Sequence, residues 1–443
     1  MKTKKNFHFT SFQVIALGFF ALILTGTLLL MLPVSSREPG GARFSDCLFT
    51  ATSAVCVTGL VVRDTATYWS SFGQAVIITL IQIGGMGVVT AALSLSFISG
   101  RRIGLMQRNV MRESISAPQV GGIVRLTRFI IAAAFGIELT GALLLLPAFI
   151  PEFGWGRGIW YAFFHSISAF CNAGFDLMGI RGAFSSLTGF SQSALVNIVL
   201  VCLITVGGIG FLVWNDIKQH GIHWKQYRLQ SKIVLTTSAV LILIPFLWFF
   251  FFEMRDLPAG GRVLPSLFQS VTLRTAGFNT VDLAAMSAGG QALMIMWMLI
   301  GGSPGSTAGG LKTTTVAVMV LTVLSVFRRK DDTTCFGRKI GEDAVRSAAA
   351  IVMMYFLLFF VSGMIISRVE GLPLLTCLFE TASAVGTVGL TLGITSSLGT
   401  VSRCILMALM FFGRVGGLTL IYAAQSVRQA PRGTLPVEKI TVG

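Results

Sequence analysis

One pattern of about eleven residues occurs four times in this 443-residue chain, each time between two long apolar runs. Each copy begins with phenylalanine and ends with a glycine nine or ten places later: Phe49–Gly59, Phe164–Gly174, Phe268–Gly277 and Phe379–Gly389. Each also carries a hydroxyl residue four places after the phenylalanine: Ser53, Ser168, Thr272 and Ser383. Self-similarity at a fixed period indicates repeated structural units, so four units of one architecture are predicted.

The apolar runs place these units in a membrane. The chain is 53% apolar and 12% charged, whereas charged residues make up about a quarter of a typical soluble domain. Runs of about 20 residues suit helices that cross about 30 Å of hydrocarbon, and a segment of 10 to 14 residues is too short to cross. The fold class predicted is an all-α polytopic membrane protein. It has four pseudo-repeats of span, re-entrant P-loop and span, with eight transmembrane helices around a central pore.

The expected repeats are residues 1–100, 101–222, 223–340 and 341–443, the last including a cytoplasmic tail. First spans are expected at Phe12–Leu32, Ile130–Leu146, Ile233–Phe252 and Val345–Ile366. Short helices are expected at Ser45–Val55, Ile159–Phe170, Leu264–Leu273 and Pro373–Val385. Second spans are expected at Phe72–Ile98, Ala194–Trp214, the interrupted run of residues 292–316, and Val401–Tyr422. Glycine pairs inside second spans (84/85, 207/208 and 416/417) are interpreted as helix-packing contacts.

The net charge of +16 is concentrated on one side of this layout. Of the 34 lysines and arginines, 22 lie in segments expected inside, namely 2–5, 101–128, 218–232, 328–346 and 428–439. The opposite-side segments hold 10 basic and 10 acidic residues. This positive-inside pattern predicts a multi-pass protein of the plasma membrane with both termini in the cytoplasm, and it explains the charge without a nucleic-acid partner.

A glycine-rich stretch interrupts the second span of the third repeat. We expect it to be unwound at membrane depth, where the backbone must be buried by protein or reached by water, so a polar cavity is predicted. A nucleotide-binding loop is the rival interpretation, but Leu311 separates Gly310 from Lys312 and breaks the required Gly-Lys-Ser/Thr. The predicted gate residues are Gly301, Gly302, Ser303, Pro304, Gly305, Ser306, Thr307, Ala308, Gly309, Gly310, Lys312 and Arg414.

The four repeated loops favour a site for a dehydrated cation. Backbone carbonyls can replace the water shell of a cation, glycine permits the necessary turn at positive φ, and the short helix before it directs its negative end toward the ion. The alternative is that these glycines only allow tight turns or close packing. The predicted filter residues are Cys56, Val57, Thr58, Gly59, Cys171, Asn172, Ala173, Gly174, Arg274, Thr275, Ala276, Gly277, Gly386, Thr387, Val388 and Gly389.

Few other charged or metal-binding residues occur at membrane depth. Arg414 and Lys312 are expected to face the inner half of the pore and to hold carbonyls of the unwound stretch, although Lys312 alternatively extends to the inner interface. Arg274 and Glu380 are expected to form a structural ion pair, and Glu138 has no evident partner. The cysteines are interpreted as packing residues, and the histidines lack the spacing of a metal site.

Together these motifs resemble the Trk/Ktr/HKT potassium transporters, most closely the membrane subunit of the bacterial Ktr type. The resemblance covers nearly the whole chain and rests on Ser53–Leu60, Ser168–Phe175, Arg274–Thr280, Gly386–Leu390 and Gly301–Gly310. Leu273 departs from the family, in which a hydroxyl residue is common at that position. Trk-type subunits carry two further spans at the start, and none precedes Phe12 here.

The resemblance implies a channel-like potassium-uptake subunit that binds K⁺ at Gly59, Gly174, Gly277 and Gly389. It further implies gating by the loop at Gly301–Gly310 and by Arg414, a homodimer, and a ring of cytosolic nucleotide-binding regulatory (RCK/KTN-type) subunits. No cofactor is expected in this chain; K⁺ is the transported ion and Na⁺ a coupling or activating ion.

Two other functional classes fit the sequence less well. An alternating-access cation carrier, sodium-coupled or sodium-permeable, also uses broken helices, but its halves are typically inverted and these repeats all run in the same sense. A membrane enzyme lacks any nucleophile–base or metal constellation in this sequence, so no enzymatic activity is expected.

Overall fold

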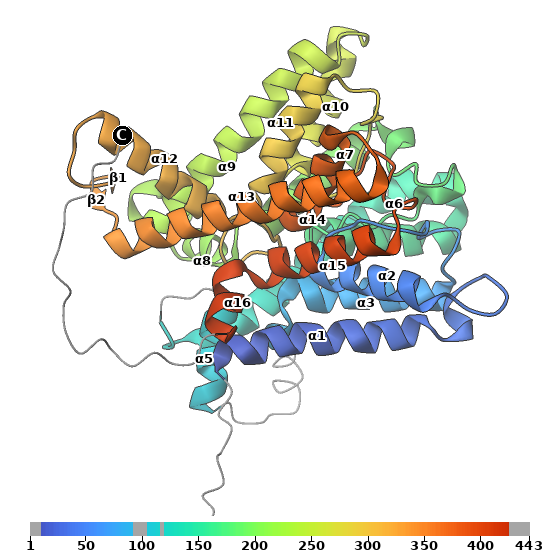
Figure 1. The fold of residues 1–443 in the computed structure, drawn as a ribbon, viewed down its shortest axis with the longest axis horizontal. Helices are drawn as coiled ribbons and strands as arrows, with labels where there is room; N and C mark the ends of the chain where they lie inside the picture. The colour runs from blue at the N-terminus through green and yellow to red at the C-terminus, as the bar shows by residue number, and fades with distance from the viewer. Residues whose placement is uncertain (1–9, 92–103, 116–118, 425–443) are drawn as a thin grey trace, which may run out of the picture.

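The computed structural model describes residues 10–91, 104–115 and 119–424 (Figure 1). Within those ranges the protein is helical, apart from one antiparallel hairpin, β1 (Thr334–Cys335) paired with β2 (Arg338–Lys339). This confirms the predicted all-α class. The basic segments 2–5 and 428–439, and the start of segment 101–128, lie outside the described residues.

The helices follow the predicted order of span, short helix and span. The first half of the chain forms α1 (Ser11–Leu30), α2 (Phe44–Cys56), α3 (Ser71–Met86), α5 (Leu105–Ser114), α6 (Ile123–Phe170), α7 (Ala194–Gly208) and α8 (Phe211–His220). The second half forms α9 (Leu229–Trp248), α10 (Ala259–Thr272), α11 (Ala288–Leu299), α12 (Thr313–Phe327), α13 (Glu342–Glu370), α14 (Leu374–Gly386), α15 (Thr400–Val415) and α16 (Gly417–Ala424).

Several predicted boundaries differ from the structure. The first span and the short helix of the second repeat run together as α6, with a kink at Gly154, whose φ of 79° is non-helical. The hydrophobic run predicted as Ala194–Trp214 is bent by 96° between α7 and α8. The predicted spans Phe72–Ile98 and Val401–Tyr422 are also broken, because Gly87 and Gly416 have φ of 87° and 90°.

These breaks explain why the predicted second spans are short helices. Within the described ranges, four helices are each long and apolar enough to cross a membrane unaided: α1, α6, α9 with the turn that follows it, and α13. The bent pair α7 and α8 passes the same test as one span. In the second spans of repeats one and four, Gly87 and Gly416 occupy positive φ as the C-cap residues that end α3 and α15. In repeat two, Gly210 also occupies positive φ and is the N-cap residue of α8, just after the end of α7. Glycine is tolerated there because it has no Cβ.

The short helices form the centre of the packing. α2 packs against α1, α3 and α15, which lie side by side in Figure 1, and α14 packs against α11, α13 and α15. The phenylalanine that opens each repeated motif (Phe49, Phe164, Phe268 and Phe379) is fully buried. The motif therefore specifies a packing anchor at its start as well as a glycine at its end.

Gly84 and Gly207, the first glycines of the predicted pairs 84/85 and 207/208, are close-packing contacts, as predicted. A Cβ on Gly84 would lie 2.1 Å from the Val55 carbonyl oxygen, and one on Gly207 would lie 2.0 Å from that of Phe170. In the fourth repeat Gly413 makes the corresponding contact, 2.1 Å from Val385 O, and Gly417 of the predicted pair 416/417 packs against Met354 of α13. The second spans of repeats one, two and four thus contact the last turn of their own short helix.

We predict that Gly84→Ala destabilises the protein by about 1–3 kcal/mol, the range for an added methyl group in a well-packed core. The neighbour is a backbone oxygen that cannot rotate away. Gly136→Ala in α6 is the matched control, because a Cβ there meets nothing within 4 Å. Thermal unfolding in detergent should separate the two variants; equal unfolding midpoints would contradict the packing role.

Candidate functional site

The four repeated loops meet as a closed ring of backbone. A Cβ built on Gly59 would lie 2.5 Å from Ala173 O, one on Gly174 2.8 Å from Ala276 O, one on Gly277 2.5 Å from Val388 O, and one on Gly389 2.1 Å from Thr58 O. Each glycine therefore abuts the carbonyl that precedes the glycine of the next repeat. The four φ angles are 92°, 69°, 80° and 92°, so only glycine suits these positions in both conformation and space.

A second left-handed residue recurs two places before each glycine. Val57, Asn172, Thr275 and Thr387 have φ of 56°, 59°, 66° and 52°. Three of them are β-branched, for which positive φ is a true outlier that persists only when the surroundings enforce it. Positive φ was predicted for the glycines alone, because the residue types two places earlier do not favour a left-handed turn.

The repeated hydroxyl residues hold these turns in place. The Gly59 N–H donates to Ser53 Oγ at 3.1 Å, and the Gly389 N–H donates to Ser383 Oγ at 3.0 Å. In the other two repeats the hydroxyl donates to the carbonyl after the glycine, from Ser168 Oγ to Phe175 O at 2.7 Å and from Thr272 Oγ1 to Phe278 O at 2.6 Å. The spacing of these hydroxyls was visible in the sequence, and the structure gives its reason.

The interrupted span is unwound between α11 and α12, as predicted, and other backbone satisfies it. Ser303 N–H donates to Gly208 O at 3.0 Å, Thr307 N–H to Gly207 O at 3.3 Å, and Gly310 N–H to Gly413 O at 3.2 Å. Carbonyls exposed at the glycine breaks of second spans thus bind the N–H groups of the loop.

The loop lies directly against the ring. Thr307 Oγ1 donates to Phe170 O at 3.0 Å, at the end of the second short helix, and a Cβ on Gly309 would lie 2.2 Å from Thr387 Oγ1. A cavity of about 290 Å³ adjoins the loop, lined by residues that include Gly305, Ala308 and Arg414. The predicted polar cavity is therefore present next to the unwound stretch.

Both predicted cations donate to carbonyls of the loop. The Arg414 guanidinium donates to Thr307 O and also to Gly84 O and Gly85 O in α3, the last at 2.8 Å. Lys312 Nζ donates to Ala308 O at 2.8 Å. Arg414 therefore ties the loop of the third repeat to the broken span of the first.

The predicted Arg274–Glu380 ion pair is wrong. Glu380 instead accepts hydrogen bonds from Thr395 Oγ1 at 2.9 Å, from the Leu392 N–H at 3.3 Å, and from Thr391 Oγ1. Hydroxyl and amide donors close to Glu380 in its own loop satisfy the carboxylate without the longer arginine. The Nε and Nη2 atoms of Arg274 are buried without a hydrogen-bond partner among the described residues.

Glu138 has a partner that the sequence did not reveal. Gln82 Nε2 in α3 donates to both carboxylate oxygens, at 2.9 and 3.1 Å. Cys171 Sγ of the second loop lies 3.9 Å from Glu138 Oε1. This polar group therefore lies behind the second loop and joins it to the first repeat.

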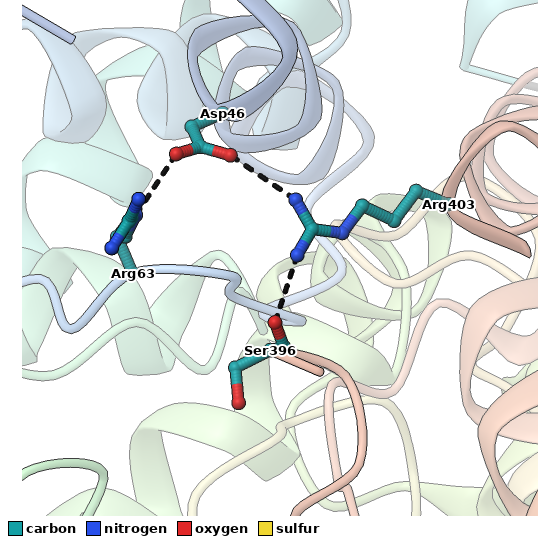
Figure 2. Close-up of polar contacts among 4 residues, drawn as sticks. All are labelled: Asp46, Arg63, Ser396 and Arg403. Atoms are coloured by element: carbon teal, nitrogen blue, oxygen red, sulfur yellow. Dashed lines mark hydrogen bonds and ion pairs between the residues drawn. The ribbon is translucent and has the colours of Figure 1, made fainter. Parts of the chain in front are cut away.

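An ion cluster at the start of α2 joins the first repeat to the fourth (Figure 2). Buried Asp46 pairs with Arg63 Nε at 2.9 Å and with Arg403 Nη1 of α15 at 3.2 Å. Arg403 Nη2 also donates to Ser396 O at 2.8 Å. Sequence analysis missed this cluster because its members are up to 357 positions apart.

The loop that follows Gly174 carries another acid. Asp176 Oδ1 accepts a hydrogen bond from the Met178 N–H at 2.9 Å. Burial raises the pKa of Asp176 to about 7, and the Asp64 carboxylate adds to the increase.

Within the described ranges no three His, Cys, Asp or Glu side chains form a group that could hold a metal ion. The groups that converge at the ring are the backbone carbonyls of Thr58, Ala173, Ala276 and Val388.

Comparisons with known proteins agree with this geometry. Residues 2–431 match the TrkH family model, described as a cation transport protein. The chain is 39% identical to the potassium/sodium uptake protein NtpJ of Enterococcus hirae, over 100% of this chain and 99% of that protein. It is 38% identical to the Ktr system potassium uptake protein B of Bacillus subtilis, over 97% and 96% of the two chains.

The fold is also that of a solved structure. The crystal structure of the potassium transporter TrkH from Vibrio parahaemolyticus superposes with a TM-score of 0.75 at 19% identity, over 96% of this chain and 87% of that one. The family consists of transport proteins, in agreement with the expectation that the chain is not an enzyme. A ring of four glycine turns, a loop packed against it, and full-length similarity to these relatives together place the chain in the TrkH family of cation transport proteins, to which it belongs.

Proposed function

We propose that this chain is the channel-like, potassium-translocating subunit of a Ktr-type uptake system in the plasma membrane. The observation that carries the proposal is the closed ring, in which each glycine abuts the carbonyl before the next glycine. Potassium uptake in the names of relatives that align with nearly the whole chain supports the choice of ion. A K⁺ ion held at Gly59, Gly174, Gly277 and Gly389 exchanges its water shell for carbonyl oxygens.

Selectivity in this proposal depends on the exactness of the carbonyl positions. The hydroxyl bonds from Ser53, Ser168, Thr272 and Ser383 fix each turn from behind, and the glycines leave no side chain between neighbouring loops. The short helices end at the ring, so their negative ends add a favourable potential for a cation. The repeat boundaries 1–100, 101–222, 223–340 and 341–443 are part of the same proposal.

Gating is assigned to the loop at Gly301–Gly310 together with Arg414. The loop lies against the ring, and the guanidinium adds both a positive charge and a tether between Thr307 O and α3. Movement of the loop requires loss of these bonds, so the loop and the arginine act as one barrier. The side of the membrane that carries the loop is assigned to the cytoplasm, with both termini, on the basis of the basic segments.

A partner is part of the proposal as well. The names of the Ktr relatives denote components of a system and so support partner components for this chain. We assign these components, following the family resemblance, to a cytosolic nucleotide-binding (RCK/KTN-type) ring beneath a homodimer of this chain. The sodium in the name of the Enterococcus hirae relative supports a second candidate, a sodium-coupled or sodium-permeable cation carrier.

Expression of this chain in cells that lack potassium uptake should restore growth at low potassium and Rb⁺ influx, because a complete ring supplies the translocation path. Influx should rise further when the cytosolic regulatory partner is co-expressed. Flux that is absent in both cases, with the protein present in the membrane, would contradict the proposal. Influx that requires Na⁺ and saturates at a slow turnover would favour the carrier.

Gly59→Ser should lower the K⁺/Na⁺ flux ratio by about ten-fold, the effect of about 1.4 kcal/mol in relative binding. A Cβ there meets Ala173 O at 2.5 Å and must move a carbonyl of the ring. Gly393→Ser is the matched control, because Gly393 has the same φ of 92° and open space around it. Paired Rb⁺ and Na⁺ flux into vesicles gives the ratio; unchanged discrimination would remove Gly59 from the filter.

Arg414→Gln should accelerate Rb⁺ flux without changing ion selectivity. A hydrogen bond to a charged group contributes about 1.5–3 kcal/mol, so loss of the tether shifts gate opening by about ten-fold or more. Arg346→Gln is the control, an arginine whose side chain is 79% exposed and pairs only with Glu342 among the described residues. Flux equal to that of the control would show that Arg414 is no part of the gate.

A further inference from the structure

A basic cavity lies apart from the ring and its loop, between the first turns of α6, the helix α8 and the start of α9. Its volume is about 710 Å³. Its polar wall comprises Arg125, Lys218, Arg228, Gln119, Asn215 and Gln219. No acidic residue lines it within the described part of the chain. Three cationic side chains and several amide donors therefore line one cavity, and this arrangement suits an anionic ligand.

The cations are only partly neutralised. Arg228 Nε lies 3.5 Å from Asp216 Oδ1, but that carboxylate also accepts from the Arg228 N–H and Ser231 Oγ, and the Arg228 side chain remains 49% exposed. Lys218 Nζ lies over the Phe129 ring at 4.1 Å and forms no ion pair with an acid in the described part of the chain. Arg125 is exposed at the mouth of the cavity. An anion that enters meets net positive charge.

The cavity also has an apolar wall. Ile123, Leu126 and Phe129 at the start of the spanning helix α6, with Leu212 of α8, line its other side. Because α8 is bent by 96° from the apolar helix α7, it runs across the end of that span. It lies at the same end of the molecule as α5, α16 and the hairpin (Figure 1). A ligand with an anionic head and an apolar body complements both walls.

We propose that this cavity binds the phosphate headgroup of an anionic phospholipid from the leaflet on the loop side of the protein. The assignment of that leaflet to the cytoplasmic side rests on the membrane orientation proposed above. Basic pockets between membrane helices on that side are suited to anionic lipid headgroups. Free inorganic phosphate shares the anionic chemistry but leaves the apolar wall unused.

The position of the cavity connects the lipid to the gate loop. At the other end of α8, the Phe211 N–H donates to Gly305 O in the loop at 2.7 Å. A headgroup held by Lys218 near the end of α8 and by Arg125 on α6 fixes the helix whose first residue holds the loop. Lipid composition thereby becomes a determinant of loop position.

The test is lipid binding to the purified full-length chain in detergent, titrated with phosphatidylglycerol and phosphatidylcholine and followed by native mass spectrometry. The pocket variant is Arg125→Gln with Lys218→Gln. The control is Lys330→Gln with Arg338→Gln, which removes the same charge from the same end of the molecule. Phosphatidylglycerol should bind the pocket variant about thirty-fold more weakly than wild type, two basic side chains at about 1 kcal/mol each. The control should bind like wild type, and both variants should unfold at the wild-type temperature.

Three results would overturn the proposal. They are equal phosphatidylglycerol affinity in pocket and control variants, equal affinity for the two lipids in wild type, and displacement of bound lipid by millimolar inorganic phosphate. A pocket variant that loses a cytosolic protein partner while keeping lipid affinity would assign the surface to that partner instead. Because the measurement needs no ion flux, its failure is separable from failure of the proposed transport function.

Discussion

Satisfaction of backbone hydrogen-bonding groups at membrane depth is the constraint on which this structure depends. Hydrocarbon offers no partner to a free N–H or C=O, so every break in a spanning helix must be paired within the protein. The breaks here are paired with one another. Carbonyls freed at Gly207, Gly208 and Gly413 receive N–H groups of the unwound loop, and Arg414 supplies donors to Thr307 O and Gly85 O. A break in the spanning helix of one repeat is thus stabilised by hydrogen bonds to breaks in the other repeats.

Glycine makes this mutual arrangement possible in two distinct ways. At Gly84 and Gly207 the missing Cβ allows a spanning helix to approach the last turn of a short helix to within contact of its carbonyl. At Gly59 and its three equivalents the missing Cβ and the positive φ act together, because the turn and the neighbouring loop both exclude a side chain. The same residue type therefore sets the distance between helices and the shape of the ring.

Charged groups add further connections between repeats whose backbones already meet at the ring. Asp46 of α2 bridges Arg63 and Arg403, and so joins the first and fourth repeats, the two ends of the chain. Glu138 joins the first repeat to the second loop through Gln82. The acid of each cluster is buried and accepts at both carboxylate oxygens, the condition under which ionic groups are tolerated in a low-dielectric interior.

The sequence by itself determined the class of fold, the four repeats, the ring glycines and the unwound stretch, because these follow from local rules of apolar length, spacing and glycine conformation. It also flagged Arg414 and Lys312, since a cation in an apolar run needs a polar partner. Only the tertiary structure decided which partners are used. Glu380 pairs with Thr395 and not with Arg274, and Val57 and Thr387 adopt left-handed turns that their side chains disfavour. Such choices depend on distances between residues far apart in the chain, which local sequence patterns do not encode.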